Sequence, residues 1–249
     1  MSGLMRQDLY AELYHVENSH WWHQHKRTIV KQLISRMKPG KALDIGCGTG
    51  KIIEELNQAG WQCVGVDKSA LAQKEGLKRG LKISIADAGK KLPFPDKCFR
   101  LVLALDFLEH VKNDQKVVRE IKRVLKPSGM IIASVPAYST LYSYWDKMLG
   151  HFRRYSKSDL IQLMKANNLE INFISYYFSW LLLPAVIIRK IKELLKIKTV
   201  SDFQTNTDNF LIVNTIKLLS QMELWLLKYI KIPFGLSLIC VATPKKSQS

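Results

Sequence analysis

A glycine-rich turn directly after an apolar run limits the fold of this chain more than any other feature. Residues 42–50 read Ala-Leu-Asp-Ile-Gly-Cys-Gly-Thr-Gly, which places glycine at positions 46, 48 and 50. Glycine tolerates the dihedrals of a tight turn, and its missing side chain lets a ligand lie against the backbone. A second apolar run, 63–66, ends in Asp67, where an acid can bind ribose hydroxyls in a doubly wound sheet. Together they predict a site for a nucleotide-like cofactor.

Strand patterns and helix patterns alternate around this turn. We expect strands at 42–45, 62–66, 82–85, 100–104 and 129–135, and helices at 50–59, 69–79 and 114–125. Such alternation predicts a parallel sheet with helices on both faces, and ligands bind beyond the carboxyl ends of its strands. A helix at 158–168 and strands at 170–176 and 236–242 complete the expected order.

Further motifs follow the turn in order, at the ends of the expected strands. They are Ile85-Ala86-Asp87-Ala88, Leu92-Pro93-Phe94-Pro95-Asp96, Phe99-Arg100-Leu101-Val102, Leu105-Asp106-Phe107-Leu108-Glu109-His110-Val111 and Leu125-Lys126-Pro127-Ser128-Gly129. This ordered set resembles the class I S-adenosylmethionine-dependent methyltransferases of type 11, in the subgroup of small-molecule and quinone methyltransferases. The resemblance covers about residues 40–170 and again 235–242. The turn lacks the G-x-G-x-x-G of nicotinamide-binding folds, which argues against a dehydrogenase.

The resemblance implies an α/β fold: a Rossmann-like doubly wound sheet of seven strands, mostly parallel, with an antiparallel last strand. A chain of 249 residues with 47% apolar content can bury the core of one such domain. We divide it into a helical lid at 1–38, a cofactor-binding core at 39–176, a helical insertion at 177–232 and the last strand with the tail at 233–249. Residues 4–37 are expected to form two helices.

The resemblance also implies S-adenosyl-L-methionine as the cofactor and S-adenosyl-L-homocysteine as its product. The methionine and ribose portion would lie against the turn, which contains Asp44, Gly46, Cys47, Gly48 and Gly50.

The acids after the next two strands would bind the rest of the cofactor. Asp67 would bind both ribose hydroxyls, and Lys68 would flank the adenine. Asp87 would accept from the adenine amino group, and Ala88 would donate its backbone amide. Two alternatives stay open: Asp67 as a cap of the following helix, and Asp87 in an exposed turn.

Residues near the sulfonium end come from two parts of the chain. Leu105 and Asp106 would lie beside the methionyl end. Arg27 of the lid would reach the cofactor carboxylate, and Trp22 would attract the sulfonium by its aromatic face.

Catalytic candidates lie at the end of the fourth strand and in the polar, aromatic segment 137–157. A general base with a pKa near neutral would help a phenol, hydroxyl or activated carbon, and histidine is the residue type that fits. His151 and His110 are the candidates, with Tyr155 in the same segment as His151. The alternative is that both imidazoles are structural. His15, His20, His23 and His25 lack convincing ligand spacing, so we expect no metal.

The charge and the cysteines bear on partners and compartment. A net charge of +17 suggests an anionic partner or a well-solvated lysine-rich surface. Because the charge is spread along the chain without an RNA-recognition signature, nucleic acid is the less favoured partner. The four cysteines have no C-x-x-C spacing, and the first twenty residues have no secretory signal pattern. We therefore expect a cytoplasmic protein.

The insertion is the unusual part of the chain. Residues 171–188 carry no charge, and this run is just long enough to suggest a membrane-spanning helix. We reject that interpretation, because Asn172, Ser175 and Pro184 interrupt the run and a strand is expected at 170–176. The helix from Pro184 to Lys198 has an isoleucine–leucine face and a basic face, as in helices that lie in a membrane interface. A second apolar helix is expected at 209–229. Two interpretations stay open and do not exclude each other: these helices bind the inner face of a membrane peripherally, and they pack on each other and roof the active site.

These features predict methyl transfer from S-adenosylmethionine to a small, hydrophobic or lipid-linked acceptor. The charge alone favours an RNA or protein methyltransferase, but no N-P-P-Y tetrapeptide follows the fourth strand, where the chain reads Leu105-Asp106-Phe107-Leu108. A non-catalytic cofactor-binding or membrane-associated scaffold is the third possibility. The intact glycine turn and both acids argue against it.

Overall fold

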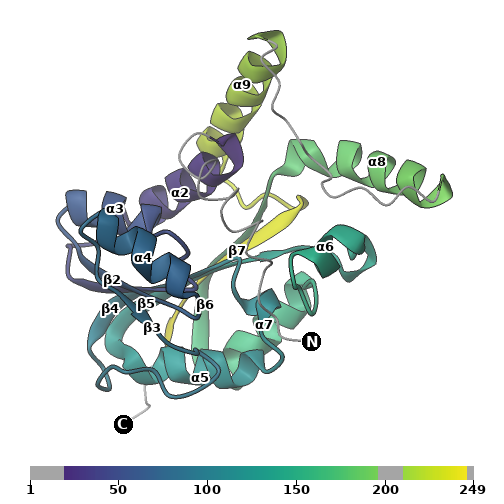
Figure 1. Ribbon diagram of the computed structural model, residues 1–249. Helices are drawn as coiled ribbons and strands as arrows, with labels where there is room; N and C mark the ends of the chain where they lie inside the picture. Colours follow the sequence, from purple (N-terminus) through teal and green to yellow (C-terminus); the bar gives the residue numbers. More distant parts are fainter. Residues whose placement is uncertain (1–19, 196–209, 246–249) are drawn as a thin grey trace.

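A seven-stranded sheet forms the centre of the molecule (Figure 1). The computed structural model describes residues 20–195 and 210–245. The strand order is β3-β2-β1-β4-β5-β7-β6, and only β7 runs antiparallel to its neighbours. The predicted fold class is thereby confirmed. The strands are β1 (Lys41–Ile45), β2 (Gln62–Asp67), β3 (Ile83–Ile85), β4 (Phe99–Leu105), β5 (Leu125–Pro136), β6 (Leu169–Tyr177) and β7 (Ser237–Pro244).

Helices cover both faces of the sheet (Figure 1). One core lies on the side of α2 (Trp21–Ile34) and α3 (Lys51–Gln58). The other lies on the side of α5 (Asp114–Val124) and α7 (Lys157–Ala166). The remaining helices are α4 (Ala70–Lys78), α6 (Tyr144–Met148), α8 (Leu182–Leu194) and α9 (Phe210–Leu226), with short 3-10 turns η1 (Leu108–His110), η2 (Ser139–Leu141) and η3 (Ser179–Leu181).

Most predicted elements form within a few residues of their expected bounds. β5 is the exception, because it starts at Leu125 rather than at residue 129. Leu125 pairs with Phe99 and Met130 pairs with Leu101, so the intervening Pro-Ser-Gly stretch lies in an irregular part of the strand. Of the two helices expected in 4–37, the second is α2, and the first lies outside the described residues.

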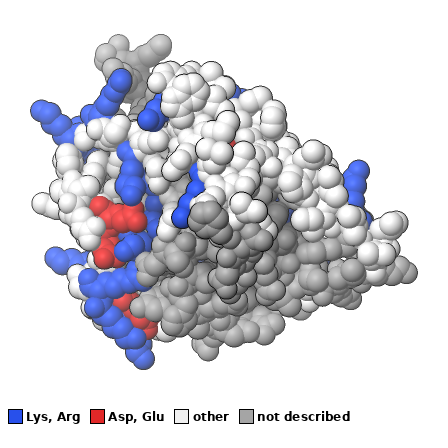
Figure 2. Space-filling view, turned by 90° about the horizontal axis from the view of Figure 1, so that it is seen from above, with Lys and Arg blue, Asp and Glu red and all other residues white. Residues whose placement is uncertain are grey.

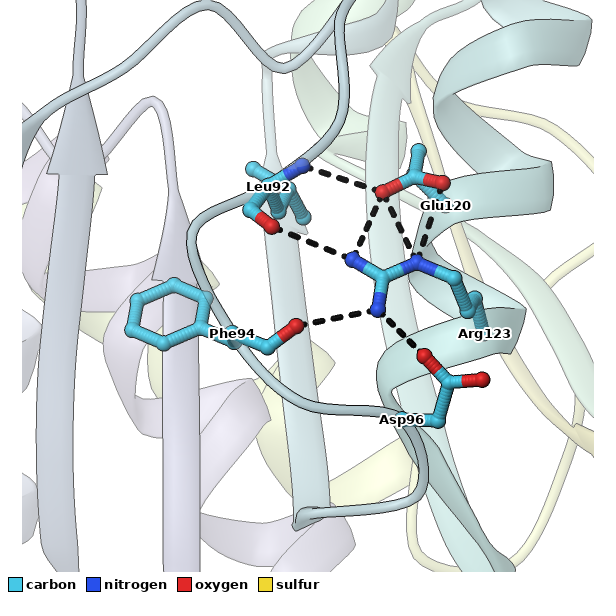
Figure 3. A network of polar contacts seen from close by, with 5 residues as sticks. All are labelled: Leu92, Phe94, Asp96, Glu120 and Arg123. Atoms are coloured by element: carbon cyan, nitrogen blue, oxygen red, sulfur yellow. Dashed lines mark hydrogen bonds and ion pairs between the residues drawn. The ribbon is translucent and has the colours of Figure 1, made fainter.

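The loop between β3 and β4 is attached to α5 by Arg123 (Figure 3). Its guanidinium donates to the carbonyls of Leu92 and Phe94 at 3.1 and 2.9 Å and to Asp96 Oδ1 at 2.6 Å. Glu120 Oε2 accepts from this guanidinium at 2.9 Å and from Leu92 N at 3.0 Å. The loop is therefore fixed immediately after the segment that contains Ala88.

The two helices of the insertion run away from the sheet in different directions. Figure 1 shows α9 rising beside α2, while α8 extends from the end of β6 towards the other side. The prediction that they pack on each other finds no support in this arrangement. Within the described ranges, no helix is both long enough and apolar enough to cross a bilayer.

Candidate active site

A cavity of about 450 Å³ opens at the carboxyl ends of the parallel strands. Its wall contains the turn after β1, the tips of β2 and β4, the face of α2 and part of the segment after β5. This is the position that the doubly wound topology predicts for a ligand.

The glycine turn is built for close contact with a ligand. Gly46, Gly48 and Gly50 have φ of +68°, +52° and +82°, a region that side chains rarely adopt. A Cβ atom on Gly46 would come within 2.2 Å of the Phe107 ring, whereas one on Gly48 would meet no heavy atom within 4 Å. Gly48 lines the cavity, so its open side is space for a ligand. Gly50 is the N-cap of α3 and lies outside the cavity wall.

Asp67 is held rigidly in the wall at the tip of β2. Its Oδ2 accepts from Gly48 N at 3.0 Å, and its Oδ1 accepts from Ser69 N at 2.8 Å. Ser69, and not Asp67, is the N-cap of α4. The carboxylate therefore joins the glycine turn to the second strand and faces the cavity beside Lys68.

The next acid, Asp87, lies beside the cavity rather than in its wall. Its carboxylate pairs with Lys68 Nζ at 3.1 Å and accepts from Gly89 N at 2.8 Å. Burial would raise the pKa of Asp87, but these two bonds outweigh it and hold the pKa below its usual value. Ala88, on the other side of Asp87, does line the cavity.

The lid helix contributes a lysine that sequence reasoning missed. Lys26 Nζ lies 2.6 Å from Asp106 Oδ2, and Ser134 Oγ donates to the other oxygen of Asp106 at 2.7 Å. Asp106 has a φ of +49°, which turns its side chain out of the line of β4. Lys26 is one helical turn after Trp22, so the two share a face of α2. This spacing of one helical turn from Trp22 is the sequence signal that could have identified Lys26 as a site residue.

The other lid candidates also reach the cavity. Trp22 lines it and stacks on Phe178 with ring centroids 3.8 Å apart. Arg27 lines it too, with Nε bound to Glu55 Oε1 at 2.8 Å. The predicted wall residues Asp44, Cys47 and Leu105 are likewise present.

The opposite end of the cavity is polar and brings His110 and His151 together. Their ring centroids lie 4.7 Å apart, with planes at 84°. His151 Nδ1 lies 2.9 Å from Asp146 Oδ1, which also accepts from Arg154 Nε at 2.7 Å. The hydrogen bonds from His151 and Arg154 lower the pKa of Asp146 against the effect of burial. Asp146 was not predicted, although it lies only five residues before His151.

Glu109 is the most unusual group at this end. It is fully buried, and neither carboxylate oxygen has a hydrogen-bond partner. Burial raises the pKa of Glu109 well above its usual value. Its backbone carbonyl accepts from Phe152 N at 2.7 Å, which attaches the His151 segment to η1.

Tyr155 does not share this cavity. Its hydroxyl donates to Asp114 Oδ2 at 2.9 Å and lies 3.2 Å from the Leu108 carbonyl, and its side chain is buried. Burial and the nearby Asp114 raise the pKa of Tyr155. The hydroxyl holds α5 against the segment after β5, so we leave Tyr155 out of the catalytic group.

The fold and the cavity define an α/β protein with an open site across the carboxyl ends of its strands. Residues 43–133 match the sequence family described as a methyltransferase domain. An uncharacterized protein of Methanocaldococcus jannaschii is 37% identical over 132 residues, covering 51% of this chain and 60% of that protein. Norajmaline N-methyltransferase of Rauvolfia serpentina is 34% identical over 113 residues, covering 42% of this chain and 38% of that enzyme. Other relatives are named as sterol and tRNA methyltransferases.

Solved structures agree with the fold over nearly the whole chain. A methyltransferase in complex with the Trm112 activator of Haloferax volcanii has a TM-score of 0.64 at 17% identity and covers 97% of this chain and 96% of that chain. Phosphoethanolamine N-methyltransferase 2 of Haemonchus contortus, in complex with S-adenosyl-L-methionine, has a TM-score of 0.60 at 20% identity, covering 90% of this chain and 53% of that chain.

Residues 43–133 are thus similar to the methyltransferase-domain family, and the two solved structures share the fold of this chain. The chain spans 60% and 38% of the lengths of the two curated relatives above. Their names cover several kinds of acceptor, so the acceptor has to be argued from the site itself.

Proposed function

We propose that this protein transfers a methyl group from S-adenosylmethionine to a small, hydrophobic or lipid-linked acceptor that it meets at a membrane surface. The observation that carries the first part is the cavity wall of Gly48, Asp67, Lys68 and Ala88. Its open glycine face and its rigid carboxylate suit an adenosine ribose. When bound, S-adenosylmethionine supplies a methyl group on a sulfonium whose sulfur leaves with the bonding electrons.

The residues at the polar end would handle the acceptor. His151 is oriented by Asp146, and burial keeps the nearby His110 neutral by lowering its pKa to about 4. In the simplest form His151 takes the proton of the acceptor as the new bond to the methyl carbon forms. Trp22 and Lys26 of α2 line the same cavity, so α2 would help to align the reactants.

The insertion supports an acceptor that lies in or on a lipid surface. Apolar side chains on both helices are open to solvent, and the exposed fractions of Leu194 and Leu211 are 83% and 73%. Leu183, Leu218, Trp225 and Tyr229 are also more than half exposed. Because Arg189 of α8 lines the cavity and donates to the Leu141 carbonyl, this exposed surface adjoins the active site.

The charge of the same surface fits an anionic bilayer. Lys190 on α8, Lys217 on α9, and Lys228 and Lys231 after α9 are exposed, and the acid of α9, Glu223, is buried. Figure 2 views the molecule from the side of these helices and shows large uncharged areas; Lys and Arg gather mainly at one edge, with two groups of acids among them. Each lysine near an anionic surface contributes on the order of 1 kcal/mol, and apolar burial adds about 25 cal/mol per Å².

An acceptor screen tests the proposal. The full chain is incubated with methyl-labelled S-adenosylmethionine and total lipid, quinone-precursor or RNA fractions. We expect label in a lipid or quinone-precursor product, and none with Gly48→Val. Label in RNA alone would overturn the proposed acceptor class and favour the tRNA-type relatives. Cofactor binding without transfer to any fraction would instead indicate a scaffold.

A further inference from the structure

Glu109, His110 and His151 form a cluster with the composition of a metal site. One ligand atom from each, a carboxylate oxygen or an imidazole nitrogen, lies within 4.8 Å of the other two. All three residues line the cavity at its polar end. We propose that these three side chains bind a divalent transition-metal ion of the Zn²⁺ type, and that this ion holds the oxygen of the methyl acceptor. The inference rests on the proposed function and deepens it.

Both imidazoles are oriented as metal ligands usually are. A ligating histidine commonly gives its second ring nitrogen to a carboxylate or a backbone carbonyl, which fixes the ring. His151 Nδ1 is bound to Asp146, so Nε2 is left for a cation. His110 forms a backbone hydrogen bond with Gly150. Neutral imidazole is the form that binds a metal.

Glu109 gives independent support for a bound cation. A buried carboxylate without hydrogen bonds costs several kcal/mol unless it is neutralised, paired or bound to a metal. The two cations that act on Glu109, Lys26 and Arg154, already have carboxylate partners in Asp106 and Asp146, at 2.6 and 2.7 Å. A divalent ion would satisfy both the charge and the empty lone pairs of Glu109.

The ligand set indicates which ion fits. Two imidazoles and one carboxylate suit zinc and its neighbours, and they leave a fourth tetrahedral position open in catalytic sites. Bonds of 2.0–2.2 Å would place the ligand atoms about 3.4 Å from one another, and these atoms already lie within 4.8 Å of one another. Because all three residues line the cavity, an acceptor there could take the fourth position.

The ion changes how the acceptor is activated. A hydroxyl oxygen bound to a divalent cation loses its proton far more readily than a free one. In this scheme the hydroxyl proton leaves to solvent water, and His151 serves as a ligand rather than as the base. The oxygen lone pair then forms the bond to the methyl carbon, while the carbon–sulfur electron pair returns to sulfur.

Cobalt binding tests this inference directly. The full-length protein is freed of metal with a chelator, and Co²⁺ is added while visible absorption and heat are recorded. We expect one Co²⁺ per chain, with competition by Zn²⁺. Glu109→Gln and His151→Asn should each weaken Co²⁺ binding at least about tenfold, since even second-layer partners of metal ligands contribute 10–100-fold. The matched control is His23→Gln, a cavity histidine outside the cluster, which should bind Co²⁺ like the parent.

The affinity for S-adenosylhomocysteine, measured on the same samples, separates this inference from the proposed function. Unchanged affinity in Glu109→Gln shows that the variant is folded and that its cofactor site is intact. If the parent binds S-adenosylhomocysteine but no Co²⁺, or if both variants keep Co²⁺, the metal inference is wrong and the proposed function stands. If the parent does not bind S-adenosylhomocysteine, the proposed function fails whatever Co²⁺ does.

Discussion

At the scale of single residues, contacts from distant parts of the chain help to build the site. Lys26 reaches Asp106 across 80 positions, and Phe152 N, next to His151, donates to the backbone carbonyl of Glu109. The sequence predicted the individual histidines from their residue type and strand-end position. It could not show that the Glu109 carboxylate has no hydrogen-bond partner, because that depends on how α2, η1 and the segment after β5 pack.

His151→Ala is the residue-scale prediction for catalysis. Without this imidazole the acceptor is not activated, whether the imidazole serves as a base or as a metal ligand. Turnover should fall by about 10²–10⁴-fold, the usual contribution of general acid–base catalysis, while the affinity for S-adenosylhomocysteine stays within about twofold, because His151 lies away from the glycine turn and cofactor contacts typically change affinity by larger factors. Turnover equal to the parent's would make His151 a structural residue and leave His110 as the candidate.

At the scale of elements, the sheet, its turns and the two insertion helices followed from sequence, whereas the directions of those two helices did not. Alternating apolar runs and glycine turns specify strands locally, so β1 to β4 lie close to their expected bounds. The direction of α9 is set instead by one buried acid. Glu223 accepts from His25 Nε2 at 2.7 Å, from Phe178 N at 2.8 Å and from Ser179 N at 2.7 Å, which fastens α9 to α2 and η3.

Glu223→Gln should loosen this junction. Burial would raise the pKa of Glu223, but the bonds from His25 and Ser179 lower it. A carboxyl with a lowered folded-state pKa stabilises the protein above its unfolded pKa of about 4.3, and the stabilisation is lost as the pH falls through the folded value. We expect a loss of about 1–3 kcal/mol at neutral pH. Thermal unfolding should show this difference shrinking towards acid pH; a difference independent of pH would contradict the assigned role.

Arg123→Ala tests the attachment of the loop between β3 and β4. The substitution removes donors from the Leu92 and Phe94 carbonyls and from two carboxylates at once. We expect about 1–3 kcal/mol lower stability in chemical unfolding, the range for charge-assisted hydrogen bonds, and weaker binding of the adenosine part of the cofactor. Arg119→Ala, on the same helix, is the control. Equal stability of both variants would show that the network in Figure 3 contributes little.

At the scale of the whole molecule, exposed apolar side chains of the insertion and several exposed lysines share one side. The exposed apolar residues of α8 and α9 and the lysines around them lie on the side opposite α5 and α7 (Figure 1). Lys196 and Lys198, which the sequence analysis counted in the basic face, lie outside the described residues. Composition gives the size of the charge, but only the fold shows that exposed lysines and apolar helices share one side.

Vesicle sedimentation tests whether the side of the molecule that carries α8 and α9 binds an anionic membrane surface. The protein should pellet with anionic vesicles at low salt and much less with neutral vesicles or at high salt. Lys190→Glu combined with Lys217→Glu should weaken pelleting by more than about tenfold. Each lysine that is removed loses roughly 1 kcal/mol of attraction to the anionic surface, and each new glutamate is repelled by it. Lys116→Glu combined with Lys165→Glu makes the same charge change on α5 and α7 and should have a smaller effect. Equal losses in both pairs would mean that only the net charge matters.

The most direct test of the central claim is calorimetry with S-adenosylhomocysteine. The claim is that the glycine turn and Asp67 form the cofactor site. We expect one molecule bound per chain, with binding abolished in Gly48→Val, whose new side chain would occupy the open space beside the turn, and strongly weakened in Asp67→Ala. Lys165→Ala on α7 is the control and should bind like the parent. Unchanged affinity in both folded site variants, or no binding by the parent protein, would contradict the account.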